Sequence, residues 1–431
     1  MSDAQPEASE GAPSPRFLGG LSRNVIALGA VSFFTDMSSE IIYPLLPLFL
    51  TTVLGAGAGA VGAIEGAAES TSALLKLASG WWSDRVARRK PLVLGGYVLA
   101  SLMRPLIALA QSATQVMIIR VSDRVGKGIR GSPRDALIAE SVDPSVRGRA
   151  FGFHRAADHA GAVVGPLIAF AILRSRHVAT LEPESRAMLL RHLFWLAAIP
   201  GALSVLVIIF FVRDVPRSED ARSQASISAS RAGFGSRFWA VLGVMLLFTL
   251  GNSSDAFLLL RAAQLGVATS LVPVLWAMLH VVKSASSTPG GILSDRVGRR
   301  PLIVAGWVIY AFVYVCFGVS TREWQAWALF AVYGVYFGLT EGVQTALVAD
   351  LVPASRRGAA FGWYYLAIGL GALPASLLFG VIWDHAGPAT AFFVGAAIAL
   401  VAAAGIFLAA PARHAGSPAS ALQQQRDPGL S

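Results

Sequence analysis

The sequence predicts an all-α integral membrane protein with twelve transmembrane helices in two six-helix bundles related by an internal repeat. Of its 431 residues, 55% are hydrophobic and 14% are charged, and the mean hydropathy is +0.60. A soluble domain carries about 25% charged residues, so an ordinary globular enzyme is excluded. One short basic sequence also occurs twice, at Gly80–Lys90 and Gly291–Pro301, each time between two apolar runs. Internal repeats of this kind are typical of secondary transporters.

The hydropathy pattern supports each predicted span in order. A spanning helix needs roughly 20 mostly apolar residues. Such runs lie near 24–53, 58–81, 91–110, 115–139, 150–173, 188–212, 238–262, 270–292, 302–319, 325–349, 359–382 and 388–411. We therefore expect a tail (1–21), one bundle (22–212), a linker rich in Ser and Arg (213–237), a second bundle (238–411) and a second tail (412–431). The tails and the linker are predicted to be disordered or flexible.

The distribution of charge predicts the orientation. The net charge is +10, but the basic residues gather in alternate loops rather than on one nucleic-acid-binding surface. Basic loops stay on the cytoplasmic side of a membrane. Both termini and these loops are therefore predicted to be cytoplasmic in a multi-pass plasma membrane protein, with a bacterial inner membrane favoured. The basic loop residues are Arg85, Arg88, Arg89, Lys90, Arg147, Arg149, Arg213, Arg217, Arg222, Arg231, Arg296, Arg299, Arg300, Arg356 and Arg357.

The repeat extends beyond the two loops. Leu137–Glu140 returns as Leu347–Asp350, and Arg147–Gly152 returns as Arg357–Gly362. Within the first and seventh spans, Ser38-Ser39-Glu40 is matched by Ser253-Ser254-Asp255. Because these landmarks occur in the same order in both halves, we expect the two halves to have the same architecture.

The two loops resemble the signature of the major facilitator superfamily, Gly-x-Leu-Ala/Ser-Asp-Arg-x-Gly-Arg-Arg/Lys. The second copy matches throughout, whereas the first has Trp82 and Ala87 at two of the positions. The resemblance implies two bundles around a central cavity that opens alternately to either side. It also implies that Asp84 latches the cytoplasmic side against the eleventh helix. The alternative is that the arginines in these loops are only topology anchors. The gating residues implied by the two copies are Gly80, Asp84, Arg85, Arg89, Gly291, Asp295, Arg296 and Arg300.

A second resemblance concerns the direction of transport. Gly161, Gly165 and Pro166 form a Gly-x-x-x-Gly-Pro sequence similar to the motif of superfamily members that export drugs against protons. The family pattern continues with paired glycines, where this chain has Ala169 and Phe170. The competing interpretation is close helix packing through small residues.

Charges inside the spans supply the candidate site residues. A charged side chain at mid-span costs about 2.5–3.5 kcal/mol on insertion scales, so each one is a functional candidate. The fourth span alone carries seven: Arg120, Asp123, Arg124, Lys127, Arg130, Arg134 and Asp135. We expect Arg120, Asp123, Lys127, Arg130, Tyr43 and Glu341 to line the substrate cavity, and Asp36, Glu40, Arg124, Asp158, His154 and His159 to take part in proton coupling. By resemblance, Arg124 matches the family's Arg-x-x-Gln-Gly motif, with Lys127 in place of Gln. The alternative for each charge is a structural salt bridge.

Several functions are excluded or disfavoured. The chain has no Gly-x-x-x-x-Gly-Lys-Ser/Thr phosphate loop and no His-Glu-x-x-His zinc motif. We therefore expect no enzyme activity, no metal and no cofactor, with a proton gradient as the energy source. The predicted partners are a small-molecule substrate and the lipid bilayer, without nucleic acid, and the protein is expected to act as a monomer. Proton-coupled export of a drug-like compound or metabolite is the leading function. An organic-anion or phosphorylated-metabolite carrier is the runner-up, followed by a membrane-embedded enzyme or a transport-dead receptor.

Overall fold

The computed structural model describes residues 21–83, 86, 88–142, 147–214, 234–353 and 357–410. Its first half forms six spans. The first is α1 (Arg23–Ile42), which continues through short helical turns to Val53. The next four are α3 (Ala58–Ser83), α4 (Lys90–Leu106) with a final turn to Leu109, α5 (Ala113–Glu140) and α6 (Arg147–Ser175). The sixth consists of α7 (Pro183–Leu196) and α8 (Ala198–Phe211).

The second half repeats this arrangement. Its first span is interrupted and consists of α10 (Ser236–Gly251) and α11 (Ala256–Gln264). Then follow α12 (Val272–Val297), α13 (Arg299–Val319) and α14 (Glu323–Asp350). The continuous helical stretch α15 (Arg357–Ala409) contains the last two spans, because Gly387 breaks it with φ 85° and ψ 164°. Each of the twelve predicted spans overlaps one of these segments. The predicted tails and most of the linker, residues 215–233, lie outside the described residues.

Composition alone finds fewer spans than the fold contains. Among the described residues, eight stretches are long and apolar enough to cross a membrane, and one of them holds both spans of α15. The helices α3, α5 and α12 are absent from that set because small, polar and charged residues lower their hydropathy. These three helices pack against other helices of the protein, including α15 and α6 across the two halves. Their polarity therefore indicates the interior of the transporter rather than its lipid-facing surface.

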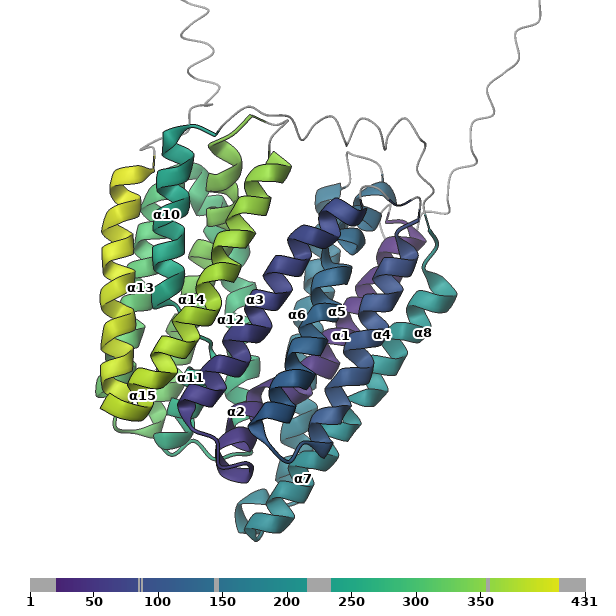
Figure 1. Ribbon diagram of the computed structural model, residues 1–431, viewed down its shortest axis with the longest axis vertical. Helices are drawn as coiled ribbons and strands as arrows, with labels where there is room; N and C mark the ends of the chain where they lie inside the picture. The colour runs from purple at the N-terminus through teal and green to yellow at the C-terminus, as the bar shows by residue number, and fades with distance from the viewer. Residues whose placement is uncertain are drawn as a thin grey trace, which may run out of the picture.

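The two bundles approach each other most closely along α3 and α15. Figure 1 shows these helices side by side between the two halves of the molecule. A Cβ added at Gly62 would lie 2.1 Å from the Ser376 carbonyl oxygen. Further along, the Ser70 hydroxyl donates to the Gly369 carbonyl at 2.5 Å and accepts from the Leu373 amide at 3.1 Å. Ser70 of one bundle is thus inserted into the backbone hydrogen-bond ladder of the other.

The bundles also join at one end of the molecule. We call the end that carries the loop residues Arg89, Lys90, Arg299 and Arg300 the basic face, and the opposite end the far face. At the far face, the Asp384 carboxylate of α15 accepts hydrogen bonds from the amides of Ala58 (2.9 Å) and Gly59 (2.7 Å). These amides belong to the first turn of α3, so a carboxylate from one bundle caps a helix N-terminus of the other.

Within the first bundle, α6 packs directly on α1. A Cβ at Gly161 would lie 2.2 Å from the Phe33 carbonyl oxygen, and one at Gly165 would lie 2.6 Å from that of Met37. Only glycine allows this approach of the two backbones. Pro166 follows inside the same helix. The Gly-x-x-x-Gly-Pro sequence is therefore placed at a helix–helix contact, which is what the packing interpretation expects.

We expect Gly62→Ala to destabilise the protein, because its new methyl group collides with the α15 backbone. Overpacking of this kind costs about 1–3 kcal/mol. The matched control is Gly243→Ala, whose Cβ would meet nothing within 4 Å on α10. Both changes gain the same helix propensity, so the difference in thermal unfolding midpoint in detergent isolates the clash. Equal midpoints for the two variants would show that α3 and α15 do not approach this closely.

We expect Asp384→Asn to loosen the far face, because a neutral amide loses about 0.3–1 kcal/mol of interaction with the helix N-terminus. Spin labels at Thr52→Cys and His385→Cys, in a Cys316→Ser background, report the separation of the bundles there. The distance distribution should broaden toward longer values. Glu184→Gln, an exposed acid beyond α6, is the control. A distribution unchanged by Asp384→Asn would show that this contact does not hold the two bundles together at the far face.

Candidate transport cavity

A buried ion network organises the first bundle around α5. Asp123 is 0% exposed and accepts a hydrogen bond from Arg104 Nε of α4 at 2.9 Å. Its other carboxylate oxygen lies 3.7 Å from both Arg120 and Arg124. Arg104 also donates to the Thr35 carbonyl of α1 at 2.9 Å. The Asp123 carboxylate thus neutralises arginines of α4 and α5. Arg104 connects this network to α1.

A second acid completes the network. Glu65 of α3 accepts three hydrogen bonds from Arg120, at 2.8, 2.9 and 3.0 Å. Both side chains are buried. The forked geometry matches a guanidinium to a carboxylate and gives a strong charge-assisted pair. Tyr43 lies against the same guanidinium, with its ring centroid 5.7 Å away.

This network corrects part of the sequence-based expectation. Arg120, Asp123 and Arg130 were expected to line the substrate cavity, but they are 3%, 0% and 4% exposed inside the first bundle. Arg130 packs on the ring of Tyr97, 4.1 Å from its centroid. The reason is that α3 and α4 supply partners that fix these charges. The alternative interpretation, a structural salt bridge, describes Arg120 and Asp123 in this conformation.

Other polar residues of the first bundle do face the interior between the bundles. Lys127 and Glu69 are both exposed, and their charges interact most strongly with one another. Arg124, 9% exposed, also interacts with Glu69. Because Lys127 and Glu69 are exposed at mid-helix yet surrounded by charges from neighbouring helices, they line a polar, solvent-accessible cavity rather than a lipid surface. Lys127 therefore lies where the sequence predicts, whereas Glu69 was not among the predicted residues.

Two carboxyl groups meet where α1 packs on α6. Asp36 and Asp158 are close enough to interact directly through their side chains. Ser32 donates a hydrogen bond of 2.7 Å to Asp158. Among the described residues, neither acid forms an ion pair with Lys or Arg within 4.0 Å. His154, one turn before Asp158, is 5% exposed, and its Nε2 atom has no hydrogen-bond partner among the described residues.

The interior is closed toward the far face by contacts between α1 and α12. Trp276 Nε1 donates to Glu40 at 2.7 Å, and its ring lies 5.0 Å from that of Tyr43. One turn further along α12, His280 lies 6.4 Å from His159 of α6, measured between ring centroids. Glu40, Tyr43 and His159 are thus placed at the interface between the bundles. Trp276 was missed and His280 was given no role, because nothing in the sequence pairs α12 with α1 or α6.

The second bundle contributes both charge and aromatic rings. Lys283 of α12 pairs with Glu341 of α14 at 2.9 Å, and its ammonium also lies 4.2 Å from the centroid of Phe337. Asp255 accepts a hydrogen bond of 2.6 Å from the Tyr333 hydroxyl. Glu341 was predicted at the cavity, and Asp255 was not, although its match to Glu40 in the repeat was a signal that could have found it.

The cavity opens toward the basic face. On α6 and α12, residues between the histidine pair and the basic loops are largely exposed, including Phe151 and Ile292. A Cβ at Gly152 or Gly291 would meet nothing within 4 Å. The helices therefore separate on one side of the histidine pair and meet on the other.

The basic loops form matching clamps inside each half. Arg89 donates to Ser83 at 2.9 Å and forms an ion pair with Glu140 at the end of α5. In the second half, Arg299 contacts Ser294, Asp295 at 2.6 Å and Asp350 at 3.3 Å, at the end of α14. The acids that the repeat places at the ends of α5 and α14, Glu140 and Asp350, thus each pair with an arginine of the basic loop in the same half.

The remaining predicted gating residues behave differently. Arg300 binds the Phe407 carbonyl at 3.1 Å and packs on its ring, whereas Arg296 is exposed. Gly80 lies near Ser132, and Gly291 borders open space. Asp84 and Arg85 lie outside the described residues, so the latch assigned to Asp84 stays a prediction.

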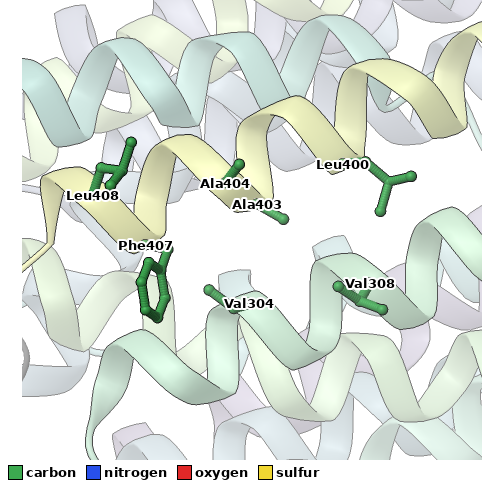
Figure 2. A pocket seen from close by; sticks show the side chains of 7 residues that line it. All are labelled: Val304, Val308, Leu400, Ala403, Ala404, Phe407 and Leu408. Atoms are coloured by element: carbon green, nitrogen blue, oxygen red, sulfur yellow. The ribbon is translucent and has the colours of Figure 1, made fainter.

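Two further pockets lie away from this cavity. An apolar one of about 360 Å³ lies between α13 and the end of α15, and Figure 2 shows that all its lining side chains are hydrocarbon. Its members Phe407 and Leu408 are 53% and 83% exposed on the outer surface, so lipid chains can fill it. The other, of about 840 Å³, lies at the basic face beside the start of α1, and its lining includes Arg23 and Arg213. Neither lies between the two bundles.

Comparison with known proteins identifies the family. The model of the Major Facilitator Superfamily matches residues 28–282 and 257–428. The chain belongs to this superfamily. An uncharacterized MFS-type transporter of Methanocaldococcus jannaschii is 33% identical over 387 residues, covering 88% of this chain and 93% of the relative.

Other relatives are named for different solutes. A probable 4-methylmuconolactone transporter of Cupriavidus pinatubonensis is 29% identical and covers 74% of this chain and 76% of the relative. The multidrug resistance protein MdtH of Aeromonas hydrophila is 23% identical, covering 80% and 84%. Among solved structures, a bacterial homologue of the human lysosomal transporter Spinster, in an inward-facing conformation, has a TM-score of 0.69 at 18% identity. It covers 89% of this chain and 96% of its own.

The sequence-based expectations of fold and class are therefore confirmed. The protein is an all-helical, multi-pass membrane protein with the superfamily fold, and it is a secondary transporter of a small solute rather than an enzyme. Transporters of this superfamily bind small-molecule substrates in the membrane.

We expect Asp123→Asn to destabilise the protein by about 3–5 kcal/mol, because it leaves buried arginines without their counter-charge. The measurement is the thermal unfolding midpoint together with the yield of monodisperse protein in detergent. Asp295→Asn is the control, since the Asp295 side chain is 65% exposed. A midpoint equal to that of the control would show that Asp123 does not neutralise the network.

Proposed function

We propose that this superfamily member couples the movement of protons to the export of a small organic solute. The observation that carries the proposal is the Asp36–Asp158 carboxyl pair. Two carboxyl groups that interact directly are most stable when they share one proton, since two negative charges at that distance repel. Losing or gaining that proton changes the attraction between α1 and α6, which both contribute to the contact with α12.

Neighbouring groups give the proton a route. His154 lies on α6 one turn before Asp158, and His159 follows it directly. Lys127 lies within electrostatic range of Asp36 and of Glu69. A solute bound near Lys127 would therefore change the field at the carboxyl pair. This gives a physical means for solute binding and proton binding to influence each other.

The charge of the loops supports an orientation in the membrane, and the open side of the interior supports a direction of transport. Basic loops remain cytoplasmic by the positive-inside rule, so the basic face and both termini are assigned to the cytoplasm of a plasma membrane, with a bacterial inner membrane favoured. The interior is open toward that face. A carrier resting in this state is ready to accept a solute from the cytoplasm, which supports export.

An organic-anion carrier is the second candidate. Lys127 is an exposed cation in the interior, and a relative 29% identical to this chain is named as a probable 4-methylmuconolactone transporter. The acids Glu69, Asp36 and Glu40 surround the same space and oppose an anion. We therefore rank this candidate second.

We expect Asp36→Asn and Asp158→Asn each to abolish proton-driven transport while preserving solute exchange. The assay uses proteoliposomes with an imposed pH gradient and two probes, ethidium and 4-methylmuconolactone. Exchange is measured without a gradient, and it should persist because the cavity itself is intact. Glu184→Gln, which changes an exposed acid outside the predicted gate, serves as the control. If both variants still respond to the pH gradient as the wild type does, the carboxyl pair is not the coupling site.

A further inference from the structure

The interruption between α10 and α11 is a built feature of the fold. The four residues from Asn252 to Asp255 lie between helices that end at Gly251 and begin at Ala256. The Tyr310 hydroxyl donates to the freed Gly251 carbonyl at 3.0 Å, and Tyr314 shares a hydrogen bond of 3.1 Å with Ser253. Unwound backbone inside a membrane is tolerated where protein or a polar cavity surrounds it, and transporters place binding sites there.

Asp255 at this interruption has one oxygen atom, Oδ2, that forms no hydrogen bond with the described residues. Its Oδ1 atom accepts the hydrogen bond from Tyr333, and no Lys or Arg among the described residues forms an ion pair with it. Lys283 lies within electrostatic range of Asp255 but is already paired with Glu341 at 2.9 Å. A carboxylate in a membrane span without a counter-charge is costly. It therefore calls for a positively charged occupant or a proton.

Aromatic rings surround the same place. Tyr43 lies beside Ser254 and within electrostatic range of Asp255. Its ring faces Trp276 at 5.0 Å, and Trp276 is oriented by its hydrogen bond to Glu40. Glu40, like Asp255, has no ion pair with Lys or Arg within 4.0 Å among the described residues. Two carboxylates and two rings thus lie near one another, from α1 and its extension, from α12 and from the interruption. Tyr333 of α14 contributes only its hydroxyl, because its ring is 0% exposed.

We propose that Asp255, Tyr43 and Trp276, with Glu40 behind them and Tyr333 orienting Asp255, form a subsite for the ammonium group of an organic cation. Rings and acids together favour a cation that carries hydrocarbon, because the ring faces attract its charge and its methylenes exclude water. A bare metal ion would gain little from the rings, and an anion would meet two negative charges. The proposal rests on the proposed transport function, since it names the class of solute that the cavity receives.

Equilibrium binding tests the subsite without any gradient. Benzyltrimethylammonium is titrated into detergent-solubilised wild type and followed by the shift of the thermal unfolding midpoint, with benzoate and sodium chloride as matched probes. We expect stabilisation by the ammonium alone. Asp255→Asn should weaken its binding about tenfold or more, as expected for loss of an interaction with a charged group. Trp276→Leu should weaken it by removing the ring, and Glu184→Gln, which changes an exposed acid of α7, should leave it unchanged.

Each outcome separates this subsite from the coupling proposal. Stabilisation by benzoate alone or by sodium alone would overturn the subsite, as would ammonium binding that survives both Asp255→Asn and Trp276→Leu. Tyr333→Phe keeps the ring and removes only the hydrogen bond, so it tests the site if Asp255→Asn fails to fold. Asp36→Asn should retain ammonium binding in detergent. Loss of gradient-driven transport with intact binding, or the reverse, therefore shows which of the two proposals fails.

Discussion

The structure depends on the neutralisation of the charges on α5. A helix with this many ionised side chains cannot lie in a membrane unless neighbouring helices supply opposite charges. Asp123 and Glu65 do so for Arg104, Arg120 and Arg124, through hydrogen bonds and ion pairs that involve α3, α4 and α5. Breaking any of these pairs inside the bundle leaves a buried charge. The first bundle is therefore held as one rigid unit.

The contacts between bundles are of another kind. Along α3 and α15 they consist of glycine and serine against backbone, and at the far face they consist of one carboxylate on a helix N-terminus. The Trp276–Glu40 hydrogen bond is a single polar contact. Such contacts can break and form again without separating a buried ion pair. Rigid-body movement of two bundles about this seam is thus less costly than rearrangement inside either one.

The sequence predicted the spans, their pairing in two halves and the basic loops, because hydropathy and repeats are properties of the chain itself. It also offered Asp36, Glu40, Lys127 and Glu341 as candidates, and their roles in coupling and substrate binding stay predictions. It could not predict that Arg120, Asp123 and Arg130 turn inward. A sequence gives the face of a helix on which a residue lies, whereas the rotation of that helix against its neighbours is a tertiary property. Asp384 was missed for a related reason, since its partners belong to the other bundle.

The repeat explains why the proposed cation subsite lies between the bundles. Ser38-Ser39-Glu40 and Ser253-Ser254-Asp255 occupy equivalent places in the two halves, so each bundle contributes one acid next to the Tyr43–Trp276 pair. Closing the far face brings these two negative charges toward the same rings. A bound cation reduces their repulsion and thereby favours the closed arrangement over one in which the acids separate. A ligand shifts a conformational equilibrium only through such a difference in affinity. The same two acids can therefore select the solute and also favour closure of the far face once the solute is bound.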